Sequence, residues 1–205
     1  MKNGISENKH LSFSIINYQL SIDMFIARKL KKENICEYLL YMWQVENLIR
    51  ALKLDMELIN QQIITQYPVS EQEQKEMYDW YESLIEMMRM EDKQEHEHIQ
   101  LNTNIIIELN DFHAALLKSG KAPAYNSKFY HVMPFINQLK LKQENTELSD
   151  IETCFNFQYG IMLLKMQKHE ISHETLDAQT EISKYMILLA RNYNLYQNGE
   201  LEFED

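Results

Sequence analysis

Residues 37–55 constrain the fold of this chain more than any other segment. This stretch, EYLLYMWQVENLIRALKLD, contains neither glycine nor proline, and its apolar residues recur around most of the circumference of a helix. A helix of this kind needs neighbours on most sides, so we expect it to lie in a helical core. A single glutamate, Glu46, falls inside its apolar arc.

Composition favours helices throughout. Only 4 Gly and 3 Pro are available for the tight turns that many short strands would need. The chain has 205 residues, of which 45% are hydrophobic and 25% charged, as is typical of one soluble domain. Amphipathic segments follow the helical period, and none of length alternates at the period of a strand, which predicts an all-α single-domain bundle of about seven helices.

Capping signals predict where several helices begin and end. We expect one helix over residues 26–53, an N-cap at Asp55, and a capping box formed by Ser70 and Glu73. Gly120 should end the next long helix.

The C-terminal half carries fewer of these signals. An extended loop over residues 120–126 should precede a shorter helical region that is interrupted at Pro134. A capping box at Ser149 opens the next helix, and the chain should break again near Ser172 before the last one.

Charge and cysteine usage restrict partners and location. The net charge of -11 opposes binding to nucleic-acid phosphates. Cys36 and Cys154 form no metal-binding or disulfide pattern, and no apolar run is long enough to span a membrane. These features predict a cytoplasmic protein with neither nucleic-acid nor membrane partners.

The ends of the chain differ from its middle. Residues 1–23 show no consistent apolar face, so we expect an N-terminal extension outside the core. The helical bundle domain should cover residues 24–198, and residues 199–205 form an acidic segment with the character of a frayed tail.

The sharpest chemical motif is His169, Glu170 and His173, which matches the zinc-protease pattern H-E-x-x-H. The predicted break near Ser172 separates the two imidazoles, and zinc is therefore the weaker interpretation. Glu95 with His98 could pair with the same motif in a dinuclear centre, but Glu95 and His98 lie in a polar run typical of a solvated junction. The sequence predicts no bound metal or other cofactor.

A small polar pocket is the other candidate site. Glu46 lies in an apolar arc with Arg50 one turn later, and His113 lies in the apolar stripe of another helix. A largely buried Glu46–Arg50 ion pair and a core histidine are the structural alternative. Trp43, Trp80 and Tyr81 are candidates for the pocket walls.

Three segments resemble a known family. Residues 37–55, 80–88 (WYESLIEMM) and 153–160 (TCFNFQYG) are similar to an uncharacterised family of small helical bacterial proteins, a domain of unknown function. The resemblance runs from about residue 24 to the C-terminus and implies a helical fold without implying an activity.

These observations favour a non-enzymatic helical interaction or assembly module whose partner is a protein, including a homodimer. The alternative is a small-molecule or metal-dependent enzyme built around Glu46, Arg50 and His113, or around the two histidines of the H-E-x-x-H motif.

A chain that begins at Met24 should melt within a few degrees of the full-length protein, because residues 1–23 have no apolar face to contribute to a core. Thermal unfolding followed by circular dichroism measures the difference. A large loss of stability would show that the extension is part of the packed structure.

Overall fold

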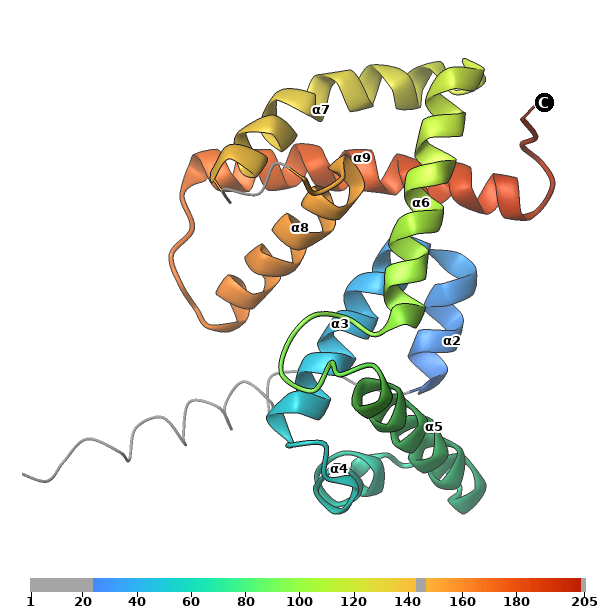
Figure 1. Cartoon of the computed structure of the whole chain (residues 1–205), viewed down its shortest axis with the longest axis vertical. Helices are drawn as coiled ribbons and strands as arrows, with labels where there is room; N and C mark the ends of the chain where they lie inside the picture. Colours follow the sequence, from blue (N-terminus) through green and yellow to red (C-terminus); the bar gives the residue numbers. More distant parts are fainter. Residues whose placement is uncertain (1–23, 143–146, 204–205) are drawn as a thin grey trace, which may run out of the picture. The chain divides into compact units, whose positions relative to one another are not determined.

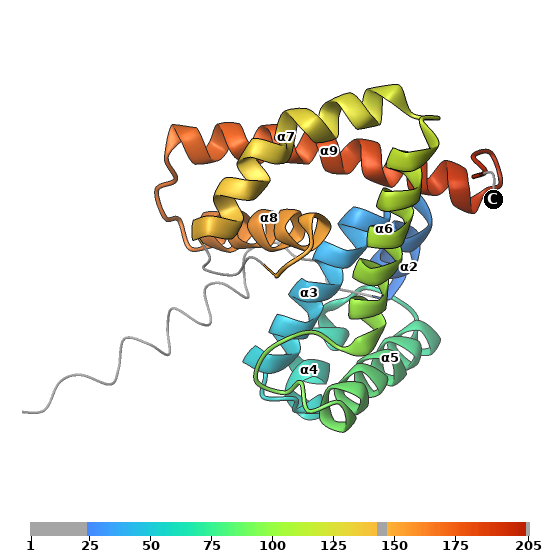
Figure 2. The ribbon, with the colours of Figure 1, turned by 45° about the horizontal axis from the view of Figure 1, so that its top comes forward.

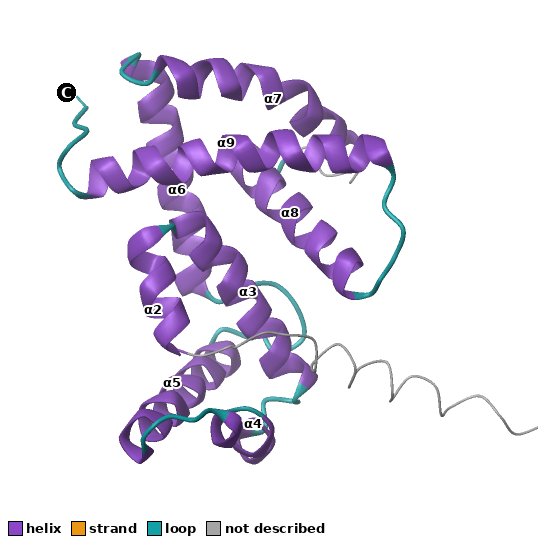
Figure 3. Ribbon diagram, turned by 180° about the vertical axis from the view of Figure 1, so that it is seen from behind, coloured by secondary structure: helices purple, strands orange, loops and turns teal. Residues whose placement is uncertain are grey.

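The computed structural model describes residues 24–142 and 147–203, and the predicted extension over residues 1–23 lies outside them. The all-α fold class and single-domain architecture are confirmed. Within the described residues there are helices and one 3-10 turn but no strand (Figure 3). The elements are α2 (Met24–Glu33), α3 (Ile35–Ala51), α4 (Met56–Gln62), η1 (Ile64–Gln66), α5 (Glu71–Met90), α6 (Gln100–Ser119), α7 (Pro123–Lys142), α8 (Asp150–Met166) and α9 (His173–Gln197).

The described residues group into two compact units. Unit 1 comprises residues 24–29 and Tyr41–Thr103, and unit 2 comprises Leu30–Leu40 and residues 104–203. The division falls within α2, α3 and α6, so each of these helices contributes residues to both units.

Unit 1 is organised around α5, against which α4 and η1 pack (Figure 2). The predicted caps are confirmed here. The Asp55 side chain accepts hydrogen bonds from the amides of Glu57 and Leu58, and Ser70 and Glu73 form the reciprocal capping box that opens α5. These short-range bonds fix the turns on either side of α4.

Unit 2 is built from α7, α8 and α9, which pack against one another (Figure 1). Aromatic and β-branched side chains fill its interior because each helix turns one apolar stripe inward. Buried members of these stripes include Tyr125, Phe129, Val132, Ile151, Phe155, Ile182, Tyr185 and Leu189.

The helix predicted over residues 26–53 is two helices, which meet at Asn34. The Asn34 side-chain oxygen accepts hydrogen bonds from the amides of Cys36 and Glu37 and so caps α3. Asn194 of α9 donates to the carbonyl of Glu33 at the end of α2. The apolar pattern continues across the break, and for this reason periodicity alone did not reveal it.

The prediction for residues 120–142 was wrong in two respects. Pro123 is the first residue of α7, where its missing amide hydrogen costs no bond, and the loop is therefore shorter than expected. The helix also continues through Pro134. The carbonyl left without its usual donor is that of Tyr130, whose side chain is exposed, so water can hydrate that face of the helix.

Two other boundaries agree with the sequence. Gly120 has a φ angle of 66°, a left-handed conformation that glycine adopts without strain. Ser172 is the N-cap of α9 and accepts a hydrogen bond from the Thr175 amide. The expected break in the chain near Ser172 is therefore confirmed.

The described part of the acidic segment, residues 199–203, is packed more closely than expected for a frayed tail. The Phe203 ring lies 5.1 Å from that of Tyr196 and 5.8 Å from that of Phe112, measured between ring centroids. Lys121 also donates a hydrogen bond to the carbonyl of Glu202. An aromatic residue in the acidic run accounts for this packing.

Replacing Asn34 with alanine should lower the free energy of unfolding by about 1 kcal/mol, the typical cost of losing an N-cap. Asn34→Ser retains a side-chain acceptor and should restore most of the loss. Urea unfolding of the two variants and the parent chain measures the difference. Equal stability of all three would show that the Asn34 cap does not support α3.

Candidate functional site

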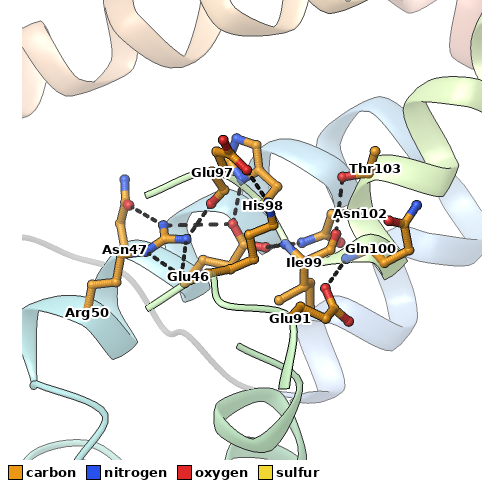
Figure 4. Close-up of polar contacts among 11 residues, drawn as sticks. Glu46, Asn47, Arg50, Glu91, Glu97, His98, Ile99, Gln100, Asn102 and Thr103 are labelled. Carbon is orange, nitrogen blue, oxygen red and sulfur yellow. Dashed lines mark hydrogen bonds and ion pairs between the residues drawn. The ribbon is translucent and has the colours of Figure 1, made fainter. Parts of the chain in front are cut away.

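Glu46 is the centre of a buried polar cluster in unit 1. It lies on α3, and only 1% of its surface is exposed. One carboxylate oxygen, Oε1, accepts hydrogen bonds from the Ile99 amide at 3.1 Å and from the Asn102 side chain at 2.7 Å (Figure 4). The other, Oε2, lies 2.5 Å from Nδ1 of His98. An ionised carboxylate only accepts hydrogen bonds, so the imidazole is the donor in this contact.

Trp43 covers the histidine of this cluster. Its indole stacks on the His98 ring with 4.0 Å between centroids and an interplanar angle of 7°. Trp43 lies about one helical turn before Glu46 on α3. One face of α3 therefore supplies both the carboxylate and the indole that stacks on His98. Trp43 is itself buried, which restricts the access of water to the Glu46–His98 contact.

Arg50 forms the predicted ion pair with Glu46, at 3.9 Å between Nη1 and Oε2. This is the longest of the Glu46 contacts. The guanidinium donates shorter hydrogen bonds to the carbonyls of Lys93 and Glu97 and to the side chain of Asn47. The main contacts of Arg50 therefore hold in place the loop over residues 91–99, which joins α5 to α6.

The amides at the end of this loop and the start of α6 donate hydrogen bonds to two carboxylates. Glu46 accepts from the Ile99 amide, and Glu91 accepts from the Gln100 amide at 2.5 Å. The first amides of a helix lack partners within the helix, and its N-terminus favours negative charge. Glu46, 53 positions before the amide it accepts from, and Glu91, nine positions before its own, thus perform the capping that a serine or aspartate within the first turn performs elsewhere.

His113 is bonded within unit 2, to partners other than Glu46. Its Nδ1 lies 2.6 Å from the Tyr125 hydroxyl and 3.0 Å from that of Tyr185, and the two hydroxyls are 2.9 Å apart. Burial lowers the pKa of His113 and raises that of both tyrosines, so all three groups are held neutral. In this triangle both tyrosine hydroxyls contact Nδ1 of the core histidine.

The remaining candidate pocket residues lie on α5. Tyr81 is fully buried, whereas Trp80 is half-buried, and their rings meet edge to face at 4.9 Å. Both belong to unit 1, with Glu46, Arg50 and Trp43. The structure thus places five of the six residues of the predicted pocket in unit 1 and the sixth, His113, in unit 2.

The residues of the metal motif lie at a helix junction. His169 and Glu170 precede α9, and His173 is its first residue; all three side chains are exposed. Among the residues that the structure describes, no three histidine, cysteine or acidic side chains are placed so that they could share a metal ion. His98, the histidine of the alternative dinuclear motif, is engaged by Glu46 instead.

The two cysteines lie in the interior of unit 2. Burial raises the pKa of the Cys36 and Cys154 thiols well above the usual range. The Cys36 thiol also contacts the carbonyl of Met186. Both residues therefore pack as small apolar side chains.

The sequence did not reveal His98 and Asn102 as partners of Glu46. His98 belongs to a run that has the composition of a solvated loop, and its partner is 52 positions away. Asn102 offered a signal, because it lies three residues after Ile99 and four before Ile106, within the apolar stripe of α6. A polar residue in such a stripe predicts a buried partner.

These features define an all-helical protein with a closed polar cluster in one unit and an aromatic core in the other. Within the part of the chain that the structure covers, no helix is long and apolar enough to cross a membrane. Residues 24–200 match the family described as Domain of unknown function (DUF4924), and the chain belongs to this family. No curated protein and no solved structure matches it.

Double-mutant cycles should rank the partners of Glu46. Glu46→Gln combined with His98→Ala should give a coupling free energy of about 1.5 to 3 kcal/mol, as for a hydrogen bond to a buried charged group. Combination with Arg50→Ala should give a smaller value, because the ion pair is longer.

His173→Ala, at an exposed site outside the cluster, serves as the control and should couple to Glu46 by no more than about 0.5 kcal/mol. Urea unfolding provides all the free energies. Stronger coupling to Arg50 than to His98 would contradict the arrangement described here.

Proposed function

We propose that this protein is a non-enzymatic helical module that acts in the cytoplasm by binding other protein chains. The observation that carries the proposal is the engagement of its buried reactive groups. Glu46 and His113 are each bonded to several partners in their own unit, and the Cys36 thiol contacts a backbone carbonyl. A catalytic acid or base needs a hydrogen-bonding position open to substrate.

The surface supports the binding half of the proposal. Several large apolar side chains of unit 2 are more than half exposed, among them Ile187, Leu141 and Tyr130. When a partner covers exposed apolar side chains, their removal from water stabilises the complex. A homodimer is the simplest assembly that would cover them, because a second copy presents the same side chains.

Native mass spectrometry of protein purified without added metal or chelator tests this function. We expect a dimer, or a complex with a second protein, that carries no stoichiometric metal or small molecule. A monomer that retains a small molecule would favour the enzyme alternative.

Zinc at one equivalent would also contradict the proposal, provided that it disappears in His173→Ala. That result would restore the metal site at His169 and His173. A bare monomer at the highest concentration tested would contradict self-association.

A further inference from the structure

A groove of about 480 Å³ opens on the surface of unit 2. Its walls come from α6, from the last turns of α9 and from the segment that follows α9. The lining residues are Asn104, Ile107, Glu108, Asp111, Phe112, Ala115, Tyr193, Tyr196 and Phe203. The volume is in the range of sites that hold a ligand or a few side chains of a partner.

Aromatic rings form much of this lining. Phe112 is buried at the base, and its ring centroid lies 5.4 Å from those of both Tyr193 and Tyr196. Tyr196 remains 41% exposed, and Ile107 on the α6 side is 50% exposed. The groove therefore offers apolar surface that the described residues leave uncovered.

The charged residues that line the groove are all acidic. Glu108 and Asp111 are one helical turn apart on α6, and no lysine, arginine or histidine lines the groove. Hydrogen bonds from the Tyr193 hydroxyl at 2.6 Å and from Gln197 at 3.2 Å hold Oε1 of Glu108 in place. Burial, and then the nearby Glu108, raise the pKa of Tyr193, which keeps its hydroxyl a donor.

Aromatic faces beside carboxylates match a cation with an apolar stem. A lysine or arginine side chain can lay its methylene groups along the rings and place its charge near the carboxylates. Anionic ligands would face two carboxylates without a compensating base. A second copy is a poorer occupant than a basic partner, because it carries the same net charge of -11.

We propose that this groove binds a basic, apolar-flanked segment of a different protein, with an arginine or lysine side chain over Tyr196 and its charge near Asp111 and Glu108. The proposal rests on the protein-binding function given above and adds the site and the chemical class of the partner. Such a segment would enter as an amphipathic helix whose apolar face meets the groove.

Fluorescence anisotropy with a dye-labelled amphipathic peptide of leucine and lysine tests the proposal on the full chain. The same peptide with glutamate in place of lysine should not bind. Asp111→Asn and Tyr196→Ala should each weaken binding of the lysine peptide at least about fivefold. Circular dichroism of each variant checks that the helices are retained.

Asp177→Asn is the matched control, because Asp177 is an exposed carboxylate on α9 outside the groove lining and its loss changes the net charge equally. It should bind like the parent chain. Equal weakening in Asp111→Asn and Asp177→Asn would overturn the proposal in favour of non-specific attraction. Absence of binding by the parent chain, or equal binding of the glutamate peptide, would also overturn it.

Two further measurements separate this proposal from the general function. A complex with a different protein, seen by native mass spectrometry, that persists in Asp111→Lys would refute the groove assignment while leaving the binding function intact. In the second measurement, millimolar tetramethylammonium competes with the lysine peptide. If it displaces the peptide from Tyr196→Ala as well as from the parent chain, the result would contradict the role of the aromatic face.

Discussion

The buried carboxylate of Glu46 is the constraint on which the organisation of unit 1 depends. A charge removed from water costs several kcal/mol unless hydrogen-bond donors replace the lost hydration. Here the donors come from His98, Ile99 and Asn102, all of which lie at the α5–α6 junction. Satisfying one side chain of α3 therefore fixes the loop conformation, the start of α6 and the stacking of Trp43 on His98.

This cluster has consequences for function. A carboxylate engaged at both oxygens and a histidine covered by an indole have little capacity left to act on a substrate. In unit 2, two tyrosine hydroxyls contact Nδ1 of His113. Polar groups in the interior thus help to specify which helices meet. Under the proposed function, partners would bind at the surface, where the groove beside Tyr196 combines aromatic and acidic groups.

Helix caps that depend on residues nearby in the chain were predicted from the sequence. Contacts between residues far apart in the chain were not. Asp55, Ser70 and Gly120 act on amides or carbonyls a few residues away, and their roles were recognised from spacing. The α6 cap was missed because it comes from Glu46 and Glu91. The burial of Glu46 was predicted from its apolar arc, but the partner at the shortest distance, His98, lies in a polar loop without helical periodicity.

Hydrogen exchange at the Ile99 amide tests the central claim most directly. If Glu46 Oε1 accepts this hydrogen in the buried cluster, the amide should exchange only through global unfolding, although it precedes the first residue of α6. In Glu46→Ala the protection of the Ile99 amide should fall by more than that of amides in the middle of α5, which lose only what the lower global stability costs. Fast exchange at Ile99 in the parent chain, or unchanged protection in Glu46→Ala, would contradict the account.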